Sequence, residues 1–147
     1  MSGIIGGAGS KSGVIGTTEL DYEEGSYTAT MTSASGSFAN FAQNTGRYIL
    51  TGKLVWVRVE FKIGASGNGN ASGDLYFNLP FAVKSQGSIH GIDFIATGSE
   101  QYATGTMLQG RFQRGLNSLV NIKTNDHANI GPANNYSYVM SMQYEVA

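Results

Sequence analysis

Few residues in this chain combine a reactive type with a spacing that supports chemistry. The most suggestive stretch is Gly7–Ser12, which reads Gly-Ala-Gly-Ser-Lys-Ser. A phosphate-binding loop has glycine directly before the lysine. It also lies between a strand and a helix, because its backbone amides cradle phosphate at a helix N-terminus. Here Ser10 precedes Lys11, and neither flanking pattern is present. The stretch is therefore more typical of a flexible Gly-Ser linker than of a nucleotide site.

Metal and acid–base chemistry have equally weak support. His90 and Asp93 lie three residues apart, and Asp126 and His127 are adjacent. These types bind metals, but strand positions three apart face opposite sides of a sheet. In residues 26–147 the carboxylates are scattered singly; no serine of the chain lies in a Gly-x-Ser-x-Gly elbow, and there is no cysteine. We therefore expect no enzyme activity, no metal site and no cofactor.

Trp56 and Arg58 are the most distinctive pair of polar-face residues. They lie two residues apart in an alternating segment and so point to the same side of a strand. Tryptophan and arginine are favoured at protein interfaces, which makes the pair a candidate interface. The alternative is that Trp56 packs in the core of a second sheet or under a loop. The sequence alone does not decide between these two interpretations.

The composition describes the framework that must hold such residues. The chain has 147 residues with 21 glycines, 13% charged residues and a net charge of −1. This charge balance does not indicate a basic surface that would bind nucleic acid. No apolar run approaches the length of a membrane span. Serine, threonine and asparagine take the place of charge, which favours a β-rich protein with many turns and a neutral polar surface.

Alternation of apolar and polar residues predicts the strands. In residues 53–63, Val55, Val57, Val59, Phe61 and Ile63 share one face. Leu75, Phe77 and Leu79 share a face further on, as do Tyr138, Met140, Met142, Tyr144 and Val146. With probable strands at 26–33, 46–52, 88–98, 105–113 and 117–124, the chain has about eight strands and no helical periodicity. We expect an all-β, antiparallel, jelly-roll-like β-sandwich.

The N-terminal 25 residues differ from the rest. Ser2–Gly6 and Ser12–Gly16 repeat the phrase Ser-Gly-Ile/Val-Ile-Gly, and this region has no aromatic residue before Tyr22. Residues 1–25 are therefore predicted to be an extended docking arm, and residues 26–147 the sandwich domain. Small apolar pairs can add as short strands or dock in grooves on another protein. The predicted docking residues are Ile4, Ile5, Val14 and Ile15.

Several short motifs carry a resemblance to a known family. They are Glu23-Glu24-Gly25, Gly46-Arg47-Tyr48 with Gly52, Leu54-Val55 with Val57, and Leu79-Pro80-Phe81. With these motifs the chain resembles short tail-fibre and virion-surface proteins of tailed bacteriophages, especially marine ones. The family usually has Trp-Thr-Pro after the acidic glycine, where this chain has Ser26-Tyr27-Thr28. The resemblance implies a jelly-roll-like trimeric domain displayed on a virion.

We therefore expect a bacteriophage structural protein that is made in the host cytoplasm and displayed on the virion surface. It would be a homotrimer whose arm binds another virion protein, either of the capsid or of a fibre base. The alternative is a receptor-binding fibre tip that recognises host-surface carbohydrate. Its ligand loop would contain Asn134, Asn135 and Tyr136. Neither nucleic acid nor membrane is an expected partner.

Overall fold

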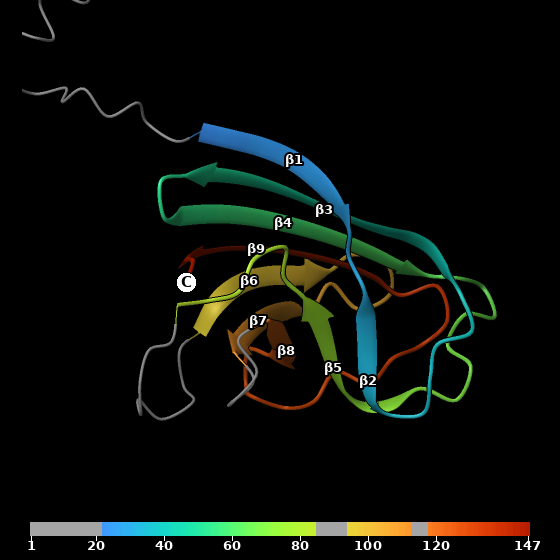
Figure 1. Ribbon diagram of the computed structural model, residues 1–147. Coiled ribbons are helices and arrows are strands. Elements are labelled where there is room, and N and C mark those ends of the chain that lie inside the picture. The colour runs from blue at the N-terminus through green and yellow to red at the C-terminus, as the bar shows by residue number, and fades with distance from the viewer. Residues whose placement is uncertain (1–21, 85–93, 113–117) are drawn as a thin grey trace, which may run out of the picture.

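The computed structural model describes residues 22–84, 94–112 and 118–147, which form one antiparallel sheet that curls into a half-barrel (Figure 1). This confirms the all-β, antiparallel class, with no helix among the described residues. About eight strands were expected, and the described chain has nine. The strands are β1 (Tyr22–Thr28), β2 (Met31–Ser35), β3 (Phe41–Thr51), β4 (Leu54–Ile63), β5 (Ser72–Asn78), β6 (Phe94–Glu100), β7 (Met107–Phe112), β8 (Leu119–Thr124) and β9 (Ser137–Glu145).

The strand order is β1-β3-β4-β9-β6-β7-β8-β5-β2. We call β1, β3, β4 and β9 the long-strand half, and β6, β7, β8, β5 and β2 the short-strand half. Strands β3, β4 and β9 have 11, 10 and 9 residues, whereas no strand of the short-strand half exceeds seven. The two halves face each other across the curl of one continuous sheet (Figure 1).

A tight hairpin sets the register of the long-strand half. Only Gly52 and Lys53 separate β3 from β4, and Thr51 pairs with Leu54. Gly52 has a φ of 58°, a left-handed conformation that glycine adopts without the steric penalty of a Cβ atom. The five predicted inward residues of β4 are all buried, which confirms its predicted orientation: Val55, Val57, Val59, Phe61 and Ile63.

The predicted strand 26–33 is instead divided by a corner at Ala29 and Thr30. Strand β1 ends before the corner and β2 begins after it, at the opposite edge of the sheet (Figure 1). Asn78 holds the corner: its Oδ1 accepts a hydrogen bond from the Thr30 amide at 2.6 Å, and its own amide donates to the Thr30 carbonyl at 3.1 Å. The Tyr27 hydroxyl also donates to the Asn78 carbonyl, at 3.2 Å. This corner accounts for the additional strand.

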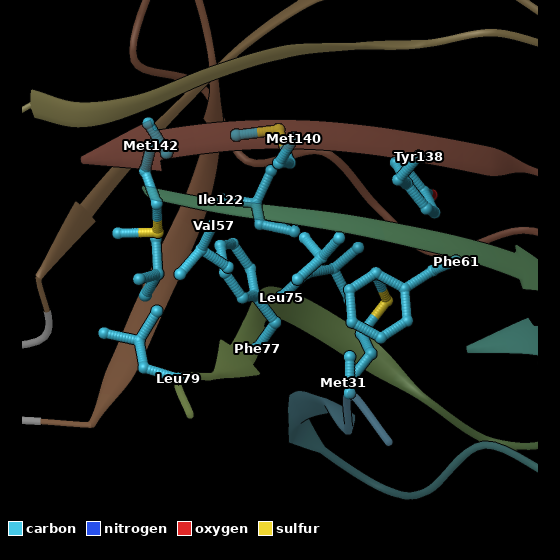
Figure 2. Close-up of a cluster of buried hydrophobic side chains, with 14 of the residues drawn as sticks. Met31, Val57, Phe61, Leu75, Phe77, Leu79, Ile122, Tyr138, Met140 and Met142 are labelled. Atoms are coloured by element: carbon cyan, nitrogen blue, oxygen red, sulfur yellow. The ribbon is translucent and has the colours of Figure 1, made fainter. Parts of the chain in front are cut away.

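One core joins the two halves. Figure 2 shows side chains of β4 and β9 directed toward those of β5 and β2. The Phe61 and Phe77 rings, from opposite sides of the curl, lie 6.2 Å apart. The predicted faces of β5 and β9 are confirmed except at Val146, which is half-buried and follows the end of β9. The buried residues are Leu75, Phe77, Leu79, Tyr138, Met140, Met142 and Tyr144.

The first strand of the sheet includes residues that the sequence analysis assigned to the N-terminal arm. Strand β1 begins at Tyr22, and residues 22–25 pair with β3. The last residues assigned to the arm therefore form the first part of the sheet. The predicted docking residues Ile4, Ile5, Val14 and Ile15 lie outside the described residues. Within the described residues, no helix is long and apolar enough to cross a membrane.

Candidate functional site

The outward face of β1, β3 and β4 carries a groove of about 690 Å³, which we call the outer groove. Alternation along β4 directs Trp56, Arg58 and Glu60 away from the core, because their neighbours in the chain fill it. The groove crosses three strands, so its position depends on the register that the hairpin sets. Its lining residues are Glu24, Gly25, Ser26, Arg47, Tyr48, Ile49, Trp56, Arg58 and Glu60.

Two arginines lie directly opposite each other in this groove. The register pairs Arg47 of β3 with Arg58 of β4. Arg58 forms an ion pair with Glu60 at 2.9 Å, and Glu60 also accepts a hydrogen bond from Gln43 at 2.8 Å. No ion pair of Arg47 occurs among the described residues. A smaller hollow of about 50 Å³ adjoins the pair, lined by Gln43, Thr45, Arg47, Arg58 and Glu60.

Trp56 lies half-buried on this outer face rather than in the core. Its cross-strand neighbours are Ile49 of β3 and Gln143 of β9. The indole therefore forms an apolar wall of the groove beside Arg58. The structure brings together the two residues predicted as an interface, and their function at this position stays a prediction.

The predicted ligand loop lies elsewhere and makes structural contacts. Asn134 Oδ1 accepts a hydrogen bond from the Asn68 amide at 2.9 Å. The Asn135 amide donates to the Gly64 carbonyl, and the Tyr136 carbonyl accepts from the Ile63 amide at 2.9 Å. These contacts hold the loop against the segment that follows β4, about 20 Å along the strand from Trp56 at roughly 3.3 Å per residue. The structure does not bring this loop and the outer groove together.

Glu100, at the end of β6, is a fully buried carboxylate. Burial raises its pKa, but hydrogen bonds from the amides of Thr104, Tyr102, Ala103 and Ser137 outweigh that effect and lower the pKa to about 2. The Thr104 hydroxyl adds a further bond at 3.0 Å. Because both oxygens are occupied, this group fixes the loop after β6 rather than serving as a general acid or base.

A second buried polar cluster lies on the outward side of β8 and β5. Lys123 donates to Asp74 Oδ1 at 2.9 Å and to Asn129, and Asn121 donates to Asp74 Oδ2 at 3.2 Å. Burial raises the pKa of Asp74, but the hydrogen bonds from Lys123 and Asn121 and the charges of Lys123 and Arg111 outweigh it and lower the pKa. Within this cluster, the positive charge of Lys123 is paired with the negative charge of Asp74.

Of the four candidate metal ligands, only Asp126 and its neighbour His127 lie among the described residues. His90 and Asp93 lie outside the described residues. Asp126 accepts hydrogen bonds from the Thr124 hydroxyl and the Ala128 amide, which together keep its pKa below the usual value. Its neighbour His127 has a positive φ of 66° in the same turn. In the described part of the chain, no three His, Cys, Asp or Glu residues are placed to hold a metal.

Sequence reasoning missed Arg47, Glu24 and Glu60 as part of the same site as Trp56. The sequence signal that could have placed Arg47 beside Arg58 was the Thr-Gly-Lys-Leu turn. If Gly52 and Lys53 form a two-residue hairpin loop, counting residues outward from this loop pairs Arg47 with Arg58.

The motifs that carry the family resemblance pack against one another. The Tyr48 hydroxyl donates to Glu23, and its ring meets the edge of Phe81 at a centroid distance of 5.0 Å. A Cβ atom on Gly25 would lie 2.7 Å from the Tyr48 hydroxyl oxygen, and one on Gly46 would lie 2.2 Å from the Tyr27 ring. Side chains at either glycine would displace these rings. Motif residues distant in sequence thus form one packing unit.

No protein-family model, curated protein or solved structure matches the chain. The assignment of a function therefore depends on the described geometry and on the resemblance of the sequence motifs.

Proposed function

We propose that this chain is a structural protein of a bacteriophage virion, made in the host cytoplasm and displayed on the particle surface as a homotrimer. It has no catalytic task in this proposal. Its curled sheet corresponds to a jelly-roll-like sandwich, in which the long-strand and short-strand halves are the two layers. Residues 1–16 attach it to another virion protein of the capsid or of a fibre base.

The observation that carries this proposal is the packing unit formed by the resemblance motifs. Tyr48 contacts both Glu23 and Phe81, which come from separate segments, while Gly25 leaves space for the Tyr48 ring. Shared motifs that form packing contacts are consistent with a shared scaffold rather than a shared reaction. A scaffold of this kind suits a protein that is displayed and bound rather than one that turns over a substrate.

A receptor-binding fibre tip is the second candidate, and the outer groove is the observation that favours it. The groove has an exposed arginine pair beside an aromatic wall formed by Trp56. Asn134, Asn135 and Tyr136, by contrast, use backbone and amide groups to hold a neighbouring loop. If the chain recognises a receptor, we expect the groove rather than this loop to do so.

Particle labelling tests the proposal directly. Antibodies against residues 22–147 should decorate virions purified from cells infected by a phage that encodes this chain. Electron microscopy would then place the label on the head or on the tail. Purified virions without label, alongside soluble chain in the lysate, would contradict the proposal. Light scattering of the isolated protein should give a trimer mass at micromolar concentration, and a stable monomer would contradict the trimer.

Deletion of residues 1–16 tests the attachment. The truncated chain should fold and form the same oligomer, because the described sheet begins at Tyr22. Particles assembled with it should lack the protein. Normal occupancy would show that attachment occurs through a face of the sheet instead.

A further inference from the structure

We propose that the outer groove binds an acidic saccharide, a sugar that carries a single carboxylate among its hydroxyl groups. In this site Arg47 and Arg58 hold the carboxylate, and the sugar ring lies against Trp56. The inference concerns the isolated chain and is independent of whether the chain belongs to a virion.

The arginine pair is the first observation. Like charges directly opposite each other on adjacent strands destabilise a sheet, and the register places Arg47 and Arg58 in this arrangement. Glu60 compensates only one of them, through a pair whose side chains are 49% and 36% exposed. Glu24 also lines the groove, but no ion pair of Arg47 occurs among the described residues, so the Arg47 guanidinium can meet a ligand carboxylate. A ligand carboxylate there would face two planar guanidinium groups, whose geometry suits bidentate contact.

The shape of the site is the second observation. The hollow of about 50 Å³ beside the arginines has room for a small charged group, while the groove of about 690 Å³ has room for the remainder of the ligand. The larger volume lies within the range of roughly 300–1,000 Å³ that small-molecule sites occupy. The two hollows share Arg47, Arg58 and Glu60, so a charged group and a larger body could be bound together.

The rest of the lining selects the chemical class. Trp56 and Ile49 supply an apolar surface against which the C–H groups of a sugar ring can pack. Glu24, Ser26 and Glu60 supply oxygen atoms that accept hydrogen bonds from hydroxyl groups. Two carboxylates in the lining would repel a polyanion such as nucleic acid. This combination favours a ligand that is rich in hydroxyl groups and carries a single negatively charged group.

The chain contains a single tryptophan, so its fluorescence reports on this groove alone. We would titrate the full chain with cellobiouronic acid and with cellobiose, which differ at the carboxylate. The acidic disaccharide should cause a saturable change in emission, with a Kd at least tenfold lower than that of cellobiose. Raising the salt concentration should weaken the binding, since the site is exposed. No saturable change with cellobiouronic acid, or equal affinity for the two sugars, would overturn the proposal.

Two variants and one anion complete the test. Arg47→Gln should raise the Kd for cellobiouronic acid at least tenfold, because a charge-assisted contact is lost. Lys53→Gln removes the same charge from the hairpin turn outside the groove and should change the Kd less than twofold. If both variants weaken binding equally, only net charge matters and the proposal fails. If acetate binds as tightly as the disaccharide, the site is a simple anion site, and the saccharide assignment is wrong.

Discussion

The two halves of the sheet differ in how they hold their charged side chains. In the long-strand half, Arg47 and Arg58 line an open groove. In the short-strand half, Lys123 is 6% exposed and Glu100 is fully buried, each held by several hydrogen bonds. The buried polar residues of the described chain all come from the short-strand half: Glu100, Asn121 and Lys123.

This difference follows from strand length and loop position. Short strands leave more chain in their connections, and these connections fold back over the sheet and fasten to charged groups. Glu100 binds the loop after β6, and Lys123 binds Asn129 in the loop after β8. In the part of the chain that the structure describes, the outward face of β3 and β4 is instead open at the outer groove. The charges of Arg47 and Arg58 stay exposed, whereas Glu100 and Lys123 in the short-strand half are buried and hold loops in place.

The largest expected effect contrasts the two faces of β4. Phe61→Ala should lower the free energy of unfolding by about 3–5 kcal/mol, because it opens a cavity in the core that joins the halves. Trp56→Ala on the outward face should cost about 1 kcal/mol, since the side chain is only half-buried. Urea unfolding measures both values. Equal losses would show that β4 is buried on both faces.

The second prediction concerns acid stability in the short-strand half. The folded-state pKa of Glu100, about 2, lies below its ordinary value of 4.5. The carboxylate therefore contributes stability that is fully present above pH 4.5 and is lost as the pH falls toward 2. The contribution is about 3 kcal/mol at neutral pH.

Glu100→Gln should be less stable than the parent at pH 7 and should lose less stability between pH 4.5 and pH 2. Thermal unfolding followed by circular dichroism at several pH values measures this difference. Parallel curves for the two proteins would contradict the assigned pKa.

The third prediction compares ion pairs in the two halves. Asp74→Ala leaves Lys123 buried without its carboxylate and should cost about 2–3 kcal/mol, less than a fully buried pair because Asp74 is 22% exposed. Glu60→Ala breaks the exposed pair with Arg58 and should cost less than about 0.5 kcal/mol. Denaturant midpoints of both variants test the comparison. A larger loss of stability for Glu60→Ala than for Asp74→Ala would contradict this prediction.

The smallest expected effect has the opposite sign. Arg47→Thr removes the positive charge that lies opposite Arg58 and introduces a residue with high strand propensity. It should raise the free energy of unfolding by a few tenths of a kcal/mol. High-precision urea titrations at low and high salt should show the gain shrinking as salt screens the repulsion. A loss of stability at low salt would mean that Arg47 supports the fold.

Sequence periodicity predicted the long-strand half better than the short-strand half. Strands β4 and β9 alternate over ten and nine residues and bury the expected faces. In β8, Val120, Asn121, Ile122 and Lys123 are all buried, so the burial of its outward side cannot be read from the alternation of apolar and polar residues. Burial of Lys123 depends on Asp74, 49 residues earlier in the chain, and a local pattern carries no signal for such a partner.

The corner at Ala29 and Thr30 was missed for a similar reason. The segment 26–33 contains neither glycine nor proline and reads as one continuous strand. Two residues that line the groove, Trp56 and Arg58, could be placed together from the sequence, since both lie on the outward side of β4. Arg47 joins them only through the hairpin register, which requires the pairing of two strands as well as the pattern of one.

The same corner has a consequence for the order of folding. Strands β1 and β2 are neighbours in the chain, yet seven strands separate them in the sheet. The β3–β4 hairpin can close through its two-residue turn at little entropic cost. Residues 22–35, by contrast, complete their pairing only when β3 and β5 are both in place. We therefore expect this segment to become ordered late, after the long-range contacts that make β-rich topologies slow to fold.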